Sequence, residues 1–202
     1  MINNNYTEAM KTISNSDFTL KGLKTFMGMD CPGINASLYY KGKKVAFLID
    51  EGNGGCLNVE WQIECVNDRP TVPATVKEAK IAMEDLINSL PKVTWEEVSE
   101  ASGNDYGSTG TYDINEETFC NELIDSALKV KEFKKLIKKI SVLTVNNEIA
   151  SYKAKADQLD SMITVNGKES TFRNFVNGES DIKLILNDLP TDEAFALYKQ
   201  YA

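Results

Sequence analysis

The residues best suited to chemistry lie in one short segment, Asp50-Glu51-Gly52-Asn53-Gly54-Gly55. Glycines let successive backbone amides point the same way, which can form an anion-binding nest. A hairpin loop that visits positive φ needs the same glycines, however, and the two acids would repel a phosphate. A phosphate-binding loop would also require a following Lys-Ser or Lys-Thr and a helix. We therefore predict a turn whose residues Asp50, Glu51, Asn53, Gly54 and Gly55 are candidates for contact with a partner.

Metal binding is the next chemistry to consider. Asp50, Glu51 and Asp30 carry the oxygen ligands that hard cations prefer, but neighbouring strand residues point to opposite faces of a sheet. A four-cysteine zinc site usually needs two close pairs, and the sequence has no CxxC pair. Its thiols are expected to stay reduced; they are Cys31, Cys56, Cys65 and Cys120. We expect neither a metal nor another cofactor.

The sequence contains no histidine. This absence excludes Ser-His-Asp and Cys-His mechanisms, histidine-ligated metals, and the commonest general base near neutral pH. Catalysis would have to use carboxylates, lysine, tyrosine or a lone thiol. Binding is therefore favoured over catalysis.

The charge is acidic overall and unevenly distributed. The net charge is −8; residues 77–125 carry 3 basic and 12 acidic groups, and residues 126–155 carry 8 basic and 2 acidic groups. The lysines of 129–139 fit the solvent face of an amphipathic helix, and the acidic run 84–125 could instead imitate the charge of DNA. With Arg69 and Arg173 as the only arginines, we do not expect nucleic-acid binding.

The length and composition indicate a globular protein. The chain has 202 residues, of which 42% are hydrophobic and 26% are charged, and it is long enough to bury a core. Its first residues lack the pattern of a secretory signal, and we find no stretch that would span a bilayer. We expect a cytoplasmic protein that does not bind membranes.

Alternating hydrophobicity predicts strands in the first third. The strands are expected at 18–27, 34–40, 45–49 and 57–65, and Lys41-Gly42-Lys43-Lys44 forms a hairpin turn between the second and third of them. Trp61 falls on the face predicted to be buried, so we assign it to the core. Two prolines indicate a connector near residues 66–74.

Helical periodicity predominates after this connector. Helices are predicted at 75–90 with a Thr75 capping box, at 94–103, and at 115–140 with Asn115 as the N-cap. Hairpins at 142–152 and 163–171, a strand at 183–186 and a helix capped by Thr191 complete the pattern. This order predicts an α+β fold: an N-terminal antiparallel meander packed with several helices, then short C-terminal hairpins. We expect one domain over 1–202; the alternative is two sub-lobes, 1–70 and 74–202.

A second candidate contact loop lies between the predicted helices. Tyr106 and Tyr112 bracket a glycine- and serine-rich stretch, and Asp105 adds a charge beside them. Aromatic residues with a polar tip are favoured at protein interfaces, and a rigid scaffold concentrates binding residues on its loops. We therefore add Asp105, Tyr106 and Tyr112 to the candidate partner-binding residues.

The N-terminal third also carries a recognisable pattern. The segment Phe26-Met27-Gly28-Met29-Asp30-Cys31-Pro32-Gly33-Ile34-Asn35-Ala36-Ser37-Leu38-Tyr39, followed by Gly42-Lys43-Lys44-Val45 and the 50–55 segment, resembles small uncharacterised proteins of tailed bacteriophages and prophages. The resemblance implies a phage origin and a recurring hairpin module, and it supplies no catalytic residues. Small phage accessory proteins often act by occupying a host or defence protein.

These observations lead to one expected function and several alternatives. We expect a phage-encoded accessory protein that binds and inhibits a host or antiviral-defence protein in the host cytoplasm. The alternatives are a binder of a nucleotide or another small ligand, a carboxylate-dependent metal enzyme, and a structural protein of the virion.

Overall fold

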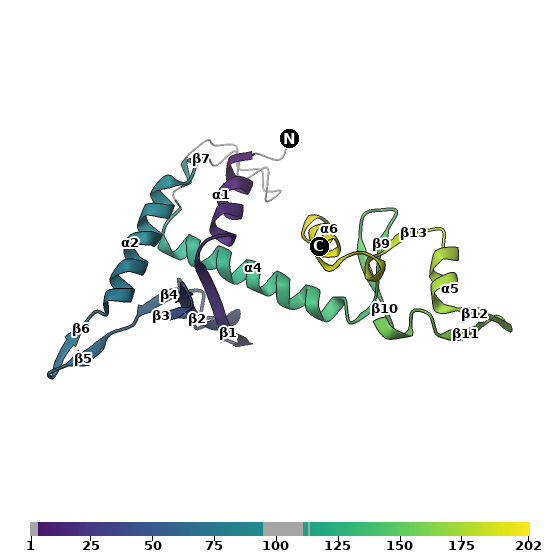
Figure 1. The fold of residues 1–202 in the computed structure, drawn as a ribbon, viewed down its shortest axis with the longest axis horizontal. Coiled ribbons are helices and arrows are strands. Elements are labelled where there is room, and N and C mark those ends of the chain that lie inside the picture. Colours follow the sequence, from purple (N-terminus) through teal and green to yellow (C-terminus); the bar gives the residue numbers. More distant parts are fainter. Residues whose placement is uncertain (1–3, 95–110, 113) are drawn as a thin grey trace. The chain divides into compact units, whose positions relative to one another are not determined.

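The first of two compact units, Met1–Ala127, is built on an antiparallel meander. The computed structural model describes residues 4–94, 111–112 and 114–202. After helix α1 (Asn4–Ser14), strands β1 (Phe18–Met27), β2 (Pro32–Tyr40), β3 (Lys43–Asp50) and β4 (Asn58–Trp61) form one sheet in sequence order (Figure 1). The predicted α+β fold with an N-terminal meander is confirmed. Close contacts divide the chain into two compact units, Met1–Ala127 and Leu128–Ala202.

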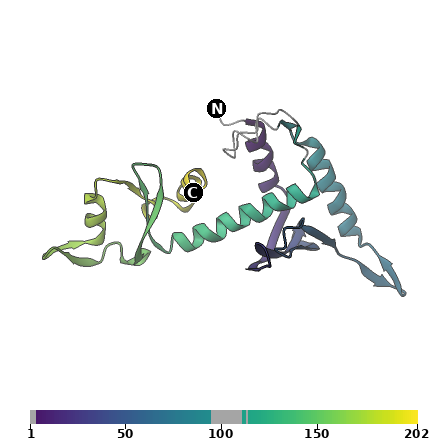
Figure 2. The ribbon, with the colours of Figure 1, turned by 180° about the vertical axis from the view of Figure 1, so that it is seen from behind.

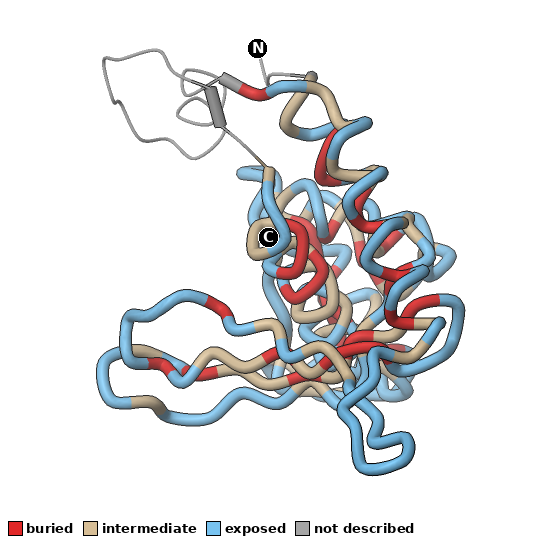
Figure 3. The backbone as a smooth tube through the Cα atoms, turned by 90° about the vertical axis from the view of Figure 1, so that its left-hand side faces the viewer, coloured by how far each residue is buried: buried red, intermediate tan, exposed pale blue. Residues whose placement is uncertain are grey.

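The last predicted strand of the meander is shorter than expected. β4 ends at Trp61, and Ile63, which the alternating pattern placed in the core, is 64% exposed. The chain leaves the sheet there and forms a separate hairpin, β5 (Glu64–Val66) and β6 (Arg69–Thr71), through a turn at Asn67 and Asp68 with positive φ. All residues of this hairpin are exposed (Figure 3). Alternation alone does not show where a strand leaves its sheet.

The hairpin also corrects the predicted connector. Residues Arg69–Thr71 form strand β6, although Pro70 lies in its centre. Proline lacks the amide that a central strand needs, but a two-stranded hairpin has a free edge on each strand, where that donor is not needed.

The helices of the first unit lie on one side of the meander (Figure 1, Figure 2). α2 (Ala74–Ser89) buries Val76, Ala79 and Met83. α4 (Glu116–Leu136) brings Phe119 to the sheet, where its ring lies 5.3 Å from that of Phe18. A two-residue pairing of β7 (Val93–Thr94) with β8 (Thr111–Tyr112) precedes α4. Helix α1 was not predicted, because its polar asparagine-rich start hides a short apolar stripe that includes Ile13.

The helix ends match the predictions in part. Asn115 accepts a hydrogen bond from the Thr118 amide at 2.9 Å, as predicted for the N-cap of α4. Thr75 and Thr191 do not cap their helices: Pro73 and Pro190 occupy the N-cap positions without a side-chain hydrogen bond. α4 also ends at Leu136 instead of Ile140, which is buried in the following strand. The helix predicted at 94–103 lies outside the described residues, except that Thr94 belongs to β7.

The second unit contains short strands and helices. β9 (Lys139–Thr144) lies between β10 (Ile149–Lys155) and β13 (Ile182–Ile185), and β11 (Met162–Val165) pairs with β12 (Lys168–Thr171). The 3-10 turn η1 (Ala156–Gln158) joins β10 to β11, and helix α5 (Phe172–Gly178) follows β12. The 3-10 turn η2 (Leu186–Asp188) joins β13 to helix α6 (Thr191–Tyr201). The predicted C-terminal hairpins are confirmed, whereas α5 was not predicted.

Candidate functional site

Two loops at one end of the meander are joined through their backbones. The turn between β1 and β2 closes with a hydrogen bond from the Gly28 amide to the Cys31 carbonyl, at 3.1 Å. The amides of Asp30 and Cys31 both donate to the carbonyl of Gly52, at 2.9 and 3.0 Å. The loop that follows β3 is therefore attached to the turn that follows β1. We call these residues, 27–31 and 51–55, the joined loops.

Glycine is required where the joined loops meet. A Cβ atom on Gly28 would collide with the backbone of Gly52 and with the Cys31 carbonyl, and a Cβ atom on Gly52 would collide with the same carbonyl. Gly52 also has a φ of +68°, which L side chains rarely adopt. The close approach explains Gly28 and Gly52 as structural residues.

Side chains within the 50–55 segment satisfy its own backbone. Asp50 accepts a hydrogen bond from the Gly52 amide at 2.8 Å, and Asn53 accepts one from the Gly55 amide at 3.1 Å. The Asn53 amide group donates to Glu51 at 3.2 Å. The side-chain oxygens of Asp50 and Asn53 thus occupy the places that a bound anion would take in a nest. This geometry is that of a turn and does not favour phosphate binding.

Two methionines extend from this rigid base into solvent. Met27 is 88% exposed and Met29 is 91% exposed, on either side of Gly28. Glu51, Asn53, Gly54 and Gly55 are exposed on the adjoining loop, whereas Asp50 is half-buried. Met27 and Met29 are not among the contact residues predicted from the sequence. The sequence feature that could have identified them is Met27-Gly28-Met29 itself, because two large apolar side chains flank a glycine at a turn, where polar residues are usual.

The second predicted contact loop is described only at one end. Asp105 and Tyr106 lie outside the described residues. The backbone of Tyr112 pairs with Val93 in the β7–β8 ladder. Their part in binding stays a prediction.

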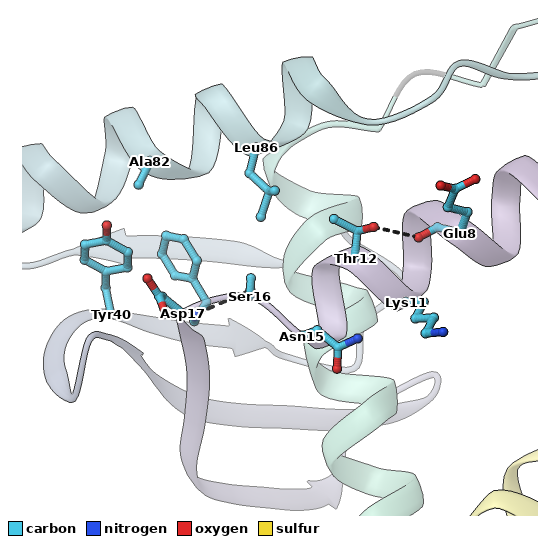
Figure 4. A pocket seen from close by; sticks show the side chains of 10 residues that line it. Glu8, Lys11, Thr12, Asn15, Ser16, Asp17, Tyr40, Ala82 and Leu86 are labelled. Atoms are coloured by element: carbon cyan, nitrogen blue, oxygen red, sulfur yellow. Dashed lines mark hydrogen bonds between the residues drawn. The ribbon is translucent and has the colours of Figure 1, made fainter.

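A cleft of about 710 Å³ lies between α1, α2 and the neighbouring ends of β1 and β2. Phe18, Tyr40 and Leu86 form its apolar part, and Figure 4 shows the polar side chains of Glu8, Lys11, Thr12, Asn15 and Asp17 around it. A nucleotide would bring phosphates to a cleft with two carboxylates and one lysine. The charge of this cleft therefore does not favour the nucleotide-binding alternative.

The perturbed ionisable groups have structural causes. Burial raises the pKa of the Cys120 thiol to about 12. In the second unit, hydrogen bonding by Arg173 lowers the pKa of Asp160, and Arg173 also contacts Asp188. Within the part of the chain that is described, no group of three or more acidic or cysteine side chains could hold a metal ion.

Two further sequence predictions have different outcomes: a solvent face for the lysines of 129–139, and a core position for Trp61. The described lysines of 129–139 are exposed, as expected for a solvent face, but Lys138 and Lys139 follow the end of α4. Trp61 is half-buried instead of lying fully in the core. Its indole donates to Glu116 at 3.3 Å, and the Lys80 ammonium lies 5.0 Å from its ring centroid. A polar edge that reaches a carboxylate keeps this side chain at the border of the core.

None of the helices described for residues 4–94 and 114–202 is long and apolar enough to cross a membrane. No protein-family model, curated protein or solved structure matches this chain.

Proposed function

We propose that this chain is a protein-binding module that inhibits its target by occupying it. The observation that carries the proposal is the pair of exposed methionines, Met27 and Met29, on a turn whose backbone is fixed by the Gly52 carbonyl. Large apolar side chains fully exposed on a rigid turn gain little in the isolated chain. They gain by burial against a second surface.

The chemistry of the joined loops suits a protein partner. Methionine is flexible and polarizable, so it adapts to irregular apolar surfaces and is common at binding sites. Glu51 adds an exposed negative charge beside the methionines, on a chain of net charge −8. Such a surface favours a partner with an apolar pocket surrounded by basic residues, because complementary charge speeds association.

The biological context comes from the phage-like pattern of residues 26–55. The joined loops lie in this pattern, so the proposed binding surface and the resemblance involve the same residues. We propose that the chain is phage-encoded and that its target is a protein of the host or of an antiviral defence, blocked stoichiometrically in the host cytoplasm. The absence of histidine supports binding over catalysis.

The test is capture of the target from infected or defence-proficient cells with matched variants. Met27→Gln combined with Met29→Gln removes the apolar surface. Met162→Gln is the control, because Met162 is also exposed, at 64%, but belongs to the second unit. We expect the double variant to weaken binding at least about tenfold, as loss of interface hot spots does, and the control to bind normally.

A photo-crosslinking residue gives an independent readout. Placed at position 27 or 29 it should join the chain covalently to the captured protein, and at position 162 it should not. Equal capture by the double variant and the parent would remove the joined loops as the binding surface. Turnover of a nucleotide or nucleic acid by the purified chain, with no captured partner, would instead support an enzyme.

A further inference from the structure

The two faces of the β1–β4 sheet have different environments. The inner face carries Phe18, Leu38 and Tyr40, which are buried beneath the helices. The Trp61 indole, also on this face, donates to Glu116 at the start of α4. The α1, α2 and α4 helices all lie on one side of the sheet (Figure 1, Figure 2). The residues that alternate with the inner set therefore form an outer face turned away from these helices.

The outer face presents a row of apolar rings. The strand register places Phe47 opposite Ser37 and Ile49 opposite Asn35, and Tyr39 follows Ser37 on the same face. Phe26 lies over Gly33, because a Cβ atom on Gly33 would collide with the Phe26 ring. Phe26 is 39% exposed, and Tyr39, Phe47 and Ile49 are half-buried. Tyr39 and Phe47 lie on neighbouring strands of this face, on either side of the register shift between Leu38 and Tyr39.

Lysines from two strands surround these rings. Lys21 is paired with Ser37, Lys24 with Asn35, and Lys44 with Tyr39. The Lys21 ammonium lies 4.4 Å from the centroid of the Tyr39 ring, and that of Lys44 lies 5.7 Å from the centroid of Phe47. Glu60, paired with Phe47, is the acidic residue on this part of the sheet. The face is locally positive on a chain whose net charge is −8.

The small number of arginines gave no reason to expect nucleic-acid binding, but the placement of lysines beside rings on this face does. We propose that this outer face binds a single-stranded nucleic acid, with bases stacked on Tyr39 and Phe47 and phosphates held by Lys21, Lys24 and Lys44. Stacking on aromatic rings beside positive charge is how single strands are bound without sequence preference. The two ring–ammonium contacts show that the rings already attract a cation. Lysine side chains are flexible enough to move from the rings to phosphates when a base takes their place.

The chemistry distinguishes this ligand from two others. A double helix keeps its bases stacked on one another, so it can use the lysines but not the rings. An acidic protein segment can also use the lysines, but it has no flat ring to stack on Tyr39 and Phe47. Single-strand binding therefore requires both the aromatic and the positive residues, and the experiment tests both.

The test is fluorescence anisotropy with labelled oligothymidine and oligouridine of about 15 nucleotides, near the upper limit of roughly 4–16 nucleotides for single-strand sites. We expect binding at low salt that weakens as salt rises. Tyr39→Ala and Phe47→Ala should each raise the Kd at least about fivefold, whereas Tyr39→Phe, which keeps the ring, should restore binding. Lys21→Gln combined with Lys44→Gln should make the negative slope of log K against log salt less steep by about 1–2.

Matched controls separate these effects from loss of fold. Lys199→Gln removes a similar ring contact, because the Lys199 ammonium lies 5.0 Å from the Phe195 centroid, and it should leave oligonucleotide binding unchanged. Circular dichroism and urea unfolding identify variants that fail to fold. If Tyr39→Ala is one of them, the oligonucleotide affinity of Tyr39→Phe is compared with that of the parent instead. Met27→Gln with Met29→Gln should also leave oligonucleotide binding unchanged, so failure of this proposal is independent of the proposed protein binding.

Four results would overturn the inference. The first is no change in anisotropy with either oligonucleotide at low salt. The second is equal affinity for duplex and single strands. The third is an unchanged Kd in folded Tyr39→Ala and Phe47→Ala variants. The fourth is competition by polyglutamate as effective as that by unlabelled oligothymidine, which would assign the face to acidic protein segments.

Discussion

Gly28 and Gly52 meet backbone to backbone, so that neither position has room for a Cβ atom. This contact joins the turn after β1 to the loop after β3, and it positions the proposed binding surface. We expect Gly28→Ala to lower the free energy of unfolding by about 2–3 kcal/mol, because the added methyl group collides with backbone that must move. Urea unfolding followed by tryptophan fluorescence measures this loss.

Gly55→Ala is the control for that prediction. Gly55 is exposed, and its added methyl group would lie 3.0 Å from Oδ1 of Asn53, the end of a flexible side chain that needs to shift only slightly. Its effect should stay within about 0.5 kcal/mol, as for most surface substitutions. Equal losses for Gly28→Ala and Gly55→Ala would show that the backbone contact does not fix the loops.

The observed helix ends predict a difference between Asn115 and Thr75, which were both predicted from the sequence to cap a helix. Asn115 accepts from the Thr118 amide, whereas Thr75 makes no capping hydrogen bond at the start of α2. Asn115→Ala should therefore cost about 1 kcal/mol of stability, and Thr75→Ala should cost much less. Thermal and urea unfolding of the two variants test the difference; a larger loss for Thr75→Ala would contradict the assigned caps.

Trp61 and Phe119 should differ in their contribution to stability. Phe119 is fully buried, so Phe119→Ala should cost about 3–5 kcal/mol. Trp61 is half-buried, so Trp61→Ala should cost about 1–2 kcal/mol, since part of its surface stays in water. Chemical unfolding followed by far-ultraviolet circular dichroism avoids dependence on the removed tryptophan. A larger loss for Trp61→Ala than for Phe119→Ala would place the indole in the core.

The thiols should react in an order set by burial. Cys56 and Cys65 are exposed, Cys31 is half-buried, and Cys120 is buried with its pKa raised to about 12. A thiol reagent at neutral pH should modify Cys56 and Cys65 first and Cys120 only after denaturation, because the thiolate is the reactive form. Mass spectrometry of labelled peptides gives the order, and all four should react in denaturant without prior reduction. Release of stoichiometric zinc would contradict this expectation.

The ion pairs of Arg173 predict that the stability of the second unit depends on pH. Because hydrogen bonding by Arg173 lowers the folded-state pKa of Asp160, the pair stabilises the fold above the unfolded pKa of about 3.9. This stabilisation is lost as pH falls through the lower folded pKa. Arg173→Gln should therefore be less stable than the parent at pH 6, and the difference should disappear under strongly acidic conditions. A difference that stays constant with pH would show that packing, not charge, is responsible.

The sequence by itself determined the class of fold and most of the strands. The alternation at 34–40 and 45–49 around Gly42 leaves little choice but a hairpin, because a shift of one residue would turn the apolar side chains to the solvent face. Asn115 identified the start of α4, because a side chain that caps a helix acts through residues adjacent in sequence. The absence of histidine excluded histidine-based catalysis and histidine-ligated metals from the sequence alone.

The tertiary structure decided the features that depend on contacts between distant residues. The sequence pattern at 57–65 continues past Trp61, and only the pairing with β3 shows that the strand ends there. The meeting of Gly28 with Gly52 lies between residues on separate loops, and it turns a flexible-looking glycine segment into a fixed support for Met27 and Met29. Likewise, Lys21 and Lys44 come to lie beside Tyr39 and Phe47 through strand register. A local sequence pattern cannot reveal these neighbours, because the sheet, not the order of residues, brings them together.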